Sequence, residues 1–315
     1  MANIRHPRRG SMQYWPRKRS RHSSVRIGSW ANYNKVKPLG FICYKAGMTH
    51  LLVDDNRAKS LTKGESITLP ATILDSPPMV VCGITFYRHT QKVSQILADK
   101  FDKHVGKTMS LPKKTRSFDQ VPEFDDLRLL VHSQPVLTST GTKKPKILEI
   151  ALGGAKADKM TYAKEHLGKE ITAAEVFEGE TAVDVHGVSK GKGFQGTVKR
   201  FGIPIRQHKA EKTKRGIGNL GSWTPKRVQF TVAQSGKMGY HLRTEYNKQI
   251  LKIGAQGQDV NPAGGLTKYG LVKGPYLLLK GSVVGSIKRA LVLTKPIRPN
   301  HSYQKDTLSV IKIAK

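Results

Sequence analysis

The side chains most able to do chemistry surround a glycine motif, GKGFQG at residues 191–196, which fits the G-x-G-x-x-G pattern of dinucleotide sites. A dinucleotide site needs a helix that opens at the third glycine, so that its amides meet the pyrophosphate. Here Gly202 and Pro204 are expected to block that helix, and Glu211, at the distance of a ribose ligand, lies in a basic loop. Kinase use is also excluded, because the chain has no VAIK, HRD or DFG motif. The motif therefore predicts no nucleotide cofactor.

The glycine motif fits better as a strand and turn through which backbone amides and cations approach phosphate groups. The cations around it are Lys190, Lys192, Lys199 and Arg200. A plain β-bulge with solvated lysines is the alternative interpretation. The first interpretation predicts a nucleic-acid contact, and the second predicts none.

Other catalytic patterns are missing from the sequence. It has no P-loop, no G-x-S-x-G elbow and no H-E-x-x-H pattern. Asp54–Asp55 and Asp125–Asp126 are adjacent pairs, which would point to opposite faces of a strand and are more typical of turns. Cys43 and Cys82 lie in apolar runs without a CxxC partner, so we expect buried thiols in a reducing compartment rather than a zinc site. We predict that the protein is not an enzyme and has no metal, cofactor or small-molecule substrate.

Positive charge is the dominant property of the chain, with 55 Lys and Arg against 22 Asp and Glu and a formal net charge of +33. Between Val185 and Lys248 the only acids are Glu211 and Glu245, and residues 201–227 hold too few apolar side chains to build a core. Ordering a backbone costs about 1–2 kcal/mol per residue, which such a segment cannot recover by burial. Its expected partner is a polyanion, and counterion release makes RNA or DNA suitable.

Aromatic residues lie among the cations in two places. The first 37 residues carry ten basic residues and no acid, with four aromatic residues between them, Tyr14, Trp15, Trp30 and Tyr33. Trp223 lies in a glycine-rich run at residues 216–227. Rings among cations suit stacking on RNA bases. The alternatives are that the N-terminal rings pack on the protein's own surface and that Trp223 anchors its loop to the folded body.

Other partners fit the pattern less well. A membrane surface is disfavoured, because the chain has no apolar run of about 20 residues and no basic amphipathic helix. Irregular glycine-rich loops with aromatic residues favour folded RNA over duplex DNA. An architectural DNA-binding protein and an RNA-modifying enzyme with a basic RNA-binding domain are the alternatives. The opening residues, MANIR, lack the apolar core of a signal peptide, so we expect a cytoplasmic protein.

The elements that position these residues are expected to be mainly β-strands. Short apolar runs separated by Gly, Pro and Asp indicate a mostly antiparallel sheet or barrel. The runs are LGFICYK (39–45), THLLV (49–53), SITLPATIL (66–74), MVVCGITFYR (79–88), TAVDVHGVSKG (181–191), RVQFTVA (227–233), KQILKIG (248–254), GPYLLLKGSVV (274–284) and RALVLTK (289–295). LSVIKI (308–313) is predicted to add a last strand.

Residues 89–180 are predicted to form a near-neutral α/β insert, because they hold 13 of the 22 acids. One helix is expected at residues 157–167, ended by Gly168. Another is expected at residues 172–177, where Thr172 and Glu175 have the spacing of a capping box. LRLLVHSQ and KILEIAL would supply its strands. We expect the insert to face away from the polyanion or to touch other protein.

The predicted organisation is a barrel interrupted by this insert and by one long basic loop. Its parts are an extended basic N-terminal arm (1–37), barrel strands (38–88), the insert (89–180), further barrel strands (181–200), the extended loop (201–227), the last barrel strands (228–295) and a C-terminal tail (296–315).

Four motifs resemble one family. KAGMT (45–49), GVSKGKGFQGTVKRFGI (187–203), IGNLGSWTPKRV (217–228) and GYHLRTEYNK (239–248) are similar to the universal third protein of the large ribosomal subunit, the L-three family. YWPRKRS in the arm resembles the archaeal and eukaryotic branch. The similarity covers nearly the whole chain. Some members have a longer, more Arg-rich loop where this chain has residues 207–215, and no modification is predicted at His208.

The resemblance implies a six-stranded β-barrel of the translation-factor type with an α/β insert. It also implies a non-enzymatic protein of cytoplasmic ribosomes that binds large-subunit rRNA early in assembly, beside neighbouring ribosomal proteins. Its central loop would reach towards the peptidyl transferase centre, with Gly221, Ser222 and Trp223 at the tip. The rRNA contacts predicted from the motifs and the charge are Arg8, Arg9, Trp15, Arg17, Lys18, Arg19, Arg21, Lys190, Lys192, Phe194, Gln195, Lys199, Arg200, Arg206, His208, Lys209, Lys212, Lys214, Arg215, Asn219, Trp223, Lys226, Arg227, His241, Arg243 and Lys248.

Overall fold

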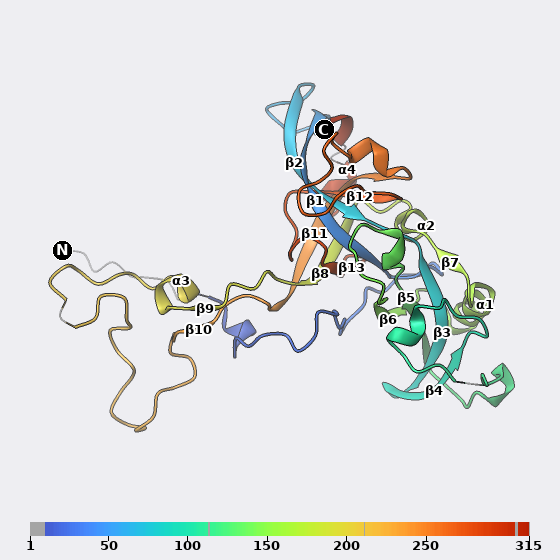
Figure 1. The fold of residues 1–315 in the computed structure, drawn as a ribbon, viewed down its shortest axis with the longest axis horizontal. Coiled ribbons are helices and arrows are strands. Elements are labelled where there is room, and N and C mark those ends of the chain that lie inside the picture. The colour runs from blue at the N-terminus through green and yellow to red at the C-terminus, as the bar shows by residue number, and fades with distance from the viewer. Residues whose placement is uncertain (1–9, 113, 211, 306–307, 315) are drawn as a thin grey trace. The chain divides into compact units, whose positions relative to one another are not determined.

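The computed structural model of the chain is mainly β, as predicted, and divides into two units (Figure 1). It describes residues 10–314 except residues 113, 211, 306 and 307. The basic unit comprises residues 1–22 and 188–242, and the strand-rich unit comprises residues 23–187 and 243–315. Each unit is described separately below.

A seven-stranded antiparallel sheet dominates the strand-rich unit, in the order β13-β8-β11-β12-β2-β1-β14. β13 also pairs with β1, so six of the strands form a closed sequence of neighbours and β14 extends β1 on the outside. The predicted runs at 39–45 and 49–53 join in one 16-residue strand, β1, whose length is visible in Figure 1. The strands are β1 (Gly40–Asp55), β2 (Ser66–Asp75), β8 (Ala182–Val188), β11 (Leu242–Gly254), β12 (Tyr276–Lys280), β13 (Ala290–Thr294) and β14 (Leu308–Ile313).

The second sheet of this unit has five strands, in the order β4-β3-β5-β6 with β7 beside β3. The sequence division placed residues 79–88 with the barrel strands, but β3, formed by those residues, pairs with β4, β5 and β7 instead. Its partners come from residues 91–171, so sequence order alone does not reveal the pairing. The strands are β3 (Met79–Arg88), β4 (Gln91–Leu97), β5 (Asp126–His132), β6 (Ile147–Ala151) and β7 (Glu170–Ile171).

Two α-helices of this unit lie close to their predicted positions in the chain. α1 spans Lys156–His166 and is followed by Gly168 at φ +79°, which suits glycine. α2 spans Ala173–Phe177, and the Thr172 hydroxyl accepts from the Glu175 amide, so the predicted N-cap is confirmed. The Glu175 carboxylate accepts from the Thr172 hydroxyl at 2.8 Å. The remaining helices in the described part of this unit are α4 (Ser302–Lys305) and 3₁₀ turns of three or four residues, η2 (Val105–Lys107), η3 (Phe118–Gln120), η4 (Pro135–Leu137) and η5 (Gly257–Val260).

The core contains residues of both sheets. Phe41 of β1, Phe86 of β3 and Phe177 of α2 are buried in one large cluster, and Tyr276 centres a smaller one. Cys43 and Cys82 are free and buried, as predicted. Burial raises the pKa of both thiols, that of Cys82 to about 12, so neither is a reactive thiolate at neutral pH.

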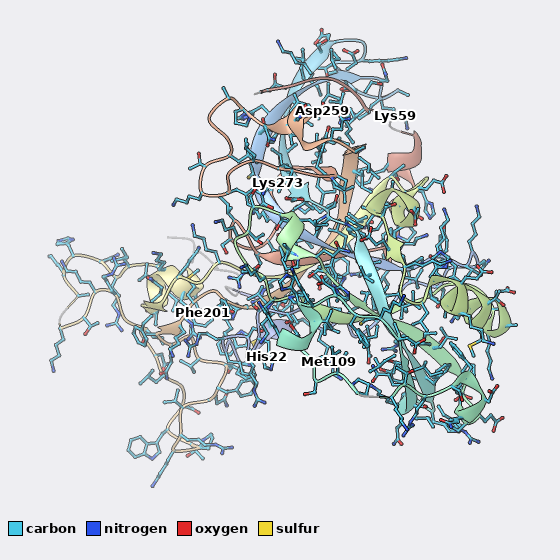
Figure 2. All side chains as sticks on the ribbon, turned by 45° about the vertical axis from the view of Figure 1, so that its right-hand side comes forward. His22, Lys59, Met109, Phe201, Asp259 and Lys273 are labelled. Atoms are coloured by element: carbon cyan, nitrogen blue, oxygen red, sulfur yellow. The ribbon has the colours of Figure 1, made fainter. Side chains whose placement is uncertain are left out.

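One carboxylate lies deep in the strand-rich unit. Asp75, at the end of β2, is 1 % exposed and accepts a 2.6 Å hydrogen bond from the Tyr269 hydroxyl. Burial raises its pKa to about 6, although the Tyr269 bond and the charge of Lys273, labelled in Figure 2, act in the opposite direction.

The predicted N-terminal arm is divided between the units. Residues 23–37 belong to the strand-rich unit, where Val25 is buried and Trp30 packs against the large core cluster. The Gly154 amide donates to the Tyr33 carbonyl at 2.8 Å. Trp30 and Tyr33 therefore follow the alternative interpretation, in which the rings pack on the protein itself: the Lys295 ammonium lies 3.3 Å from the Tyr33 ring centre.

The basic unit has little regular structure. Its elements are η1 (Met12–Tyr14), β9 (Phe194–Gln195), α3 (Thr197–Phe201) and β10 (Gly236–Lys237). The strand predicted at residues 227–233 is wrong: this apolar run has no partner strand and is irregular, with Phe230 72 % exposed. Over the described part of the chain, every helix is too short or too polar to cross a membrane, and no three His, Cys, Asp or Glu residues are grouped to hold a metal.

Candidate nucleic-acid interface

The basic unit concentrates the charge of the chain. Its sequence holds 19 Lys and Arg and a single acid, Glu211, which gives +18 of the total of +33. Its side chains stand out from the loops in Figure 2, where Phe201 marks the position of α3. A unit with this balance repels itself unless anions surround it.

A small aromatic nucleus holds residues 15–17 against α3 within this unit. The rings of Trp15 and Phe201 lie 5.2 Å apart, and the Arg17 guanidinium lies 4.6 Å from the Phe201 ring centre. Arg200 donates to the Arg17 carbonyl at 3.0 Å and to the Gln234 carbonyl at 2.8 Å. Burial lowers the pKa of Arg200 from its ordinary value. Trp15, Arg17 and Arg200 thus organise the unit in addition to any contact with a ligand.

A groove of about 1030 Å³ lies beside this nucleus, between residues 17–21 and two glycine-rich segments. Four cations, Arg17, Lys18, Arg19 and Arg21, line one side, and Lys237 lines the other. Phe194 also lines the groove with its side chain 70 % exposed. Cations that can pair with phosphates therefore surround an open ring that can stack on a base.

Glycines shape the wall of the groove. β9 and β10 pair antiparallel, and the Lys192 amide donates to the Met238 carbonyl at 2.9 Å. Gly239 has φ +76°, and a Cβ there would collide with the carbonyl oxygen of Lys190. Only glycine allows the two backbones to approach so closely.

His241 joins the wall to the N-terminal segment. The Gly239 amide donates to His241 Nε2 at 3.1 Å, so Nε2 is the acceptor and the ring proton is on Nδ1. Nδ1 then donates to the Lys18 carbonyl at 2.9 Å. The Ser20 amide donates to the Tyr240 carbonyl at 2.7 Å nearby. His241, predicted as an rRNA contact, is thus also a connection inside the unit.

The expectation that no helix follows the glycine motif is wrong. α3 begins directly after Gly196. Gly202, at φ +68°, ends it after five residues, and Pro204 follows in the loop. These two residues limit the helix rather than prevent it. Its first turn bears no acid, and its last turn carries Lys199 and Arg200.

The long loop is exposed along most of its length. Ile205, Leu220, Trp223 and Phe230 are 54 %, 53 %, 83 % and 72 % exposed. Residues 220–223 and 226–228 line a shallow hollow of about 500 Å³, and the Lys226 ammonium lies 6.0 Å from the Trp223 ring centre. The Trp223 side chain is therefore not buried within its own unit. Large apolar side chains exposed together are typical of a surface that another molecule covers.

Most predicted contacts are brought together in the basic unit. Gln195 donates to the Lys192 carbonyl at 2.7 Å, Asn219 accepts from the Gly221 amide at 2.8 Å, and Arg206 bonds to the Ile217 carbonyl. The exposed residues are Lys18, Arg19, Arg21, Lys190, Lys192, Phe194, Lys199, His208, Lys209, Lys212, Lys214, Arg215, Asn219, Gly221, Ser222, Trp223, Lys226 and Arg227.

Four predicted contacts are not among the described residues of the basic unit. Arg8 and Arg9 fall outside the described residues. Arg243 and Lys248 lie on β11 in the strand-rich unit, where the Lys248 ammonium donates to the Ser282 carbonyl at 2.9 Å and lies 3.2 Å from the Glu245 carboxylate.

Lys237 and Tyr240 were not among the predicted contacts, although both line the groove. Tyr240 precedes His241 inside a motif quoted for the family resemblance, so its position was a usable signal. Lys237 gave no signal, because only the pairing of β10 with β9 brings it opposite Phe194.

Comparison with known proteins gives one consistent result. The family model described as ribosomal protein L3 matches residues 1–115 and 113–313. The large ribosomal subunit protein uL3 of Methanobrevibacter smithii is 43 % identical over 316 residues, covering 95 % of this chain and 94 % of the relative. The uL3 proteins of Methanocaldococcus jannaschii and Archaeoglobus fulgidus are 42 % and 40 % identical, covering 94 % and 93 % of this chain and 93 % and 92 % of the relatives.

Proposed function

Because the chain belongs to the ribosomal protein L3 family, as an archaeal-type member, we propose that its basic unit binds large-subunit rRNA. The relatives are structural proteins of the large ribosomal subunit and not enzymes. The observation that carries the proposal is the loop of the basic unit, whose cations and large apolar side chains are exposed together. RNA neutralises these cations and covers these apolar side chains.

The groove beside Phe194 is the part of the unit best arranged for an RNA strand. Arg17, Arg19 and Lys237 provide positive charge on both sides. The exposed ring of Phe194 offers a stacking surface for an unpaired base. Phosphates would fix the register of the strand, and the stacked base would hold it without strong sequence preference.

The resemblance supports three finer proposals. The loop tip at Gly221, Ser222 and Trp223 extends towards the peptidyl transferase centre. The protein joins the large subunit early in assembly and contacts neighbouring ribosomal proteins there. It acts on the ribosome in the cytoplasm. The 83 % exposure of Trp223 suits a tip that inserts into folded RNA.

We also propose that the closed sequence of strands β1, β2, β12, β11, β8 and β13 is the six-stranded barrel of the translation-factor type. The pairing of β13 with β1 supports it, because a barrel has no free edge in its ring. The five-stranded sheet with α1 and α2 would then be the α/β insert.

The test of rRNA binding is charge reversal at Lys190 and Lys192, both exposed on the glycine motif. The double variant Lys190→Glu, Lys192→Glu and a matched control, Lys59→Glu, Lys63→Glu, have the same net charge. Both would be titrated with large-subunit rRNA between 50 and 200 mM salt. Each lost phosphate contact lowers the slope of log affinity against log salt by about 0.7–0.9.

We expect a shallower slope for the glycine-motif variant than for the control, with unchanged thermal unfolding. Equal slopes for the two variants would reject the phosphate contact. Wild-type binding that does not change with salt would reject the polyanion argument as a whole.

A further inference from the structure

We infer that the strand-rich unit carries its own binding groove for the phosphodiester backbone of RNA, separate from the basic unit. The groove has a volume of about 340 Å³. Its cations are Lys144 and Lys146 on one loop and Lys288 and Arg289 on another. The inference rests on the proposed RNA binding but concerns residues that the charge runs of the arm and long loop do not include.

The chemistry of the groove is that of an anion site. Three hydroxyl residues, Ser23, Thr142 and Ser286, join the four cations in its lining, and none of the lining residues is acidic. Lys144 and Lys288 are exposed, and neither forms an ion pair within the described chain. Several cations in a lining without a carboxylate give the groove a positive potential.

Hydrogen bonds of buried Lys45 fix one wall of the groove. Lys45 of β1 is 9 % exposed, and its ammonium donates to the carbonyls of Val283 at 2.5 Å and Gly285 at 3.2 Å. The Lys288 amide donates to the Lys45 carbonyl at 2.8 Å, and the Lys45 amide donates to the Arg289 carbonyl at 3.0 Å. Lys45 therefore fixes the turn that carries Lys288 and Arg289.

The backbone of that turn is in a conformation that ordinary residues seldom adopt. Lys288 has φ +68°, in the left-handed region. A lysine there costs about 1 kcal/mol or more compared with glycine, and Gly285 three residues earlier shows that glycine occurs in the same loop. Glycine at 288 would relieve the strain but would remove the charge, so the strained position keeps a cation at the rim of the groove.

The opposite wall is equally well anchored. The Lys146 amide donates to Ser133 Oγ at 2.9 Å, and Ser133 Oγ bonds to the Tyr44 hydroxyl at 2.7 Å. The Lys146 ammonium donates to Ser23 Oγ at 3.1 Å, which adds a third chain segment to the rim. Because the chain's own groups make these bonds, they hold the wall of the groove in place and reduce the ordering that binding would require.

The lining also identifies what part of RNA would bind. Tyr44 is its aromatic residue, and it is 3 % exposed with its hydroxyl bonded to Ser133, so it is a floor rather than a stacking surface. A groove with cations and hydroxyls but no exposed ring contacts phosphates and sugars rather than bases. RNA is favoured over an acidic protein segment, because phosphates accept charge-assisted hydrogen bonds from the cations and the lining hydroxyls can bond to sugar and phosphate oxygens.

The test uses the full chain and its large-subunit rRNA. In the double variant Lys144→Gln, Lys288→Gln the side chains stay long but lose their charge. The matched control is Lys59→Gln, Lys63→Gln, two exposed lysines between β1 and β2, of which Lys59 is labelled in Figure 2. Thermal unfolding of each variant establishes that it folds.

Loss of two phosphate contacts should lower the salt slope by about 1.4–1.8 and weaken binding at 150 mM salt about tenfold, whereas the control changes binding less than twofold. A groove variant whose slope and affinity equal those of the control would overturn the inference. If that variant binds normally while Lys190→Glu, Lys192→Glu binds weakly, the proposed function stands and the groove does not.

A second measurement needs no variant. An amine-reactive reagent labels exposed lysines, and bound RNA should protect Lys144 and Lys288 while Lys59 and Lys63 keep their reactivity. Equal labelling of Lys144 and Lys288 with and without RNA would show that the groove is empty in the complex and would end the proposal. Protection of these lysines by an acidic peptide but not by RNA would do the same.

Discussion

The buried carboxyl of Asp75 should make the stability of the strand-rich unit depend on pH. Its pKa is about 6 in the folded protein and 3.8 in an unfolded chain. A raised folded pKa means that the folded state holds the proton more tightly. The free energy of unfolding therefore rises as the pH falls from about 6 to about 4. The same contribution is lost as the pH rises through this window, and above about pH 6 it is absent and no longer changes.

The size of the effect follows from the shift. The folded and unfolded pKa values of Asp75 differ by about 2. Ionisation of its carboxyl therefore lowers the free energy of unfolding by about 3 kcal/mol. Asp75→Asn removes the charge but retains an oxygen that can accept from Tyr269. The weaker hydrogen bond costs about 1 kcal/mol. The variant should therefore be about 2 kcal/mol more stable than the wild type at pH 8, and slightly less stable at pH 4.

The assay is thermal unfolding of both full-length proteins without RNA at several pH values between 4 and 8. A gain of about 2 kcal/mol raises the Tm by about 4–8 °C at pH 8. Asp259→Asn is the control, because Asp259 also accepts from a tyrosine, Tyr276, at 3.1 Å, but is half-exposed. It should show no gain at pH 8. A Tm difference between Asp75→Asn and wild type that stays constant from pH 5 to 8 would refute the reasoning.

Other substitutions test the two units separately. Trp223→Ala should leave the Tm of the isolated protein unchanged, since the side chain is 83 % exposed, but should lower the translation activity of ribosomes that contain it; a matching loss of Tm would contradict this. Gly187→Ala should lower the free energy of unfolding by about 1–3 kcal/mol, because a Cβ there collides with Leu291; unfolding at the wild-type temperature would show that the core has room. Trp15→Ala should expose the segment before Arg17 to proteolysis, because Phe201 loses its ring partner, and an unchanged cleavage pattern would show that other contacts hold it.

Local signals in the sequence predicted most elements of the strand-rich unit. The run at residues 79–88 coincides with β3, and the tail run at residues 308–313 coincides with β14. The capping residue Thr172 located the start of α2. Each of these depends on neighbours in sequence, through alternation, β-branched residues or a side chain that bonds its own helix.

Features that depend on distant partners were not predictable in the same way. Residues 227–233 have the composition of a strand, but a strand also needs a neighbouring strand to pair with. No described strand pairs with these residues. Residues 79–88 were assigned to the wrong sheet for a related reason, since pairing rather than composition decides it.

The two grooves show the same limit. Arg17 and Lys237 line one of them, and Lys144 and Lys288 line the other. The two members of each pair lie far apart in the sequence. The sequence indicates cations in abundance. Their grouping follows from strand pairing and from hydrogen bonds such as those of Lys45, which leave no local pattern.

The pairing of β1 has a consequence for how the chain is made. The first half of this strand bonds to residues 290–294, and its second half bonds to residues 308–313. Synthesis proceeds from the N-terminus, so β1 leaves the exit tunnel long before these two partners exist. β2 follows at once and pairs with one edge of β1, while the other edge waits unpaired. Completion of the sheet is therefore a late event, possible only after residues 308–313 have emerged. A messenger truncated before residue 308 would yield a product with an open, aggregation-prone edge that quality-control proteases can recognise.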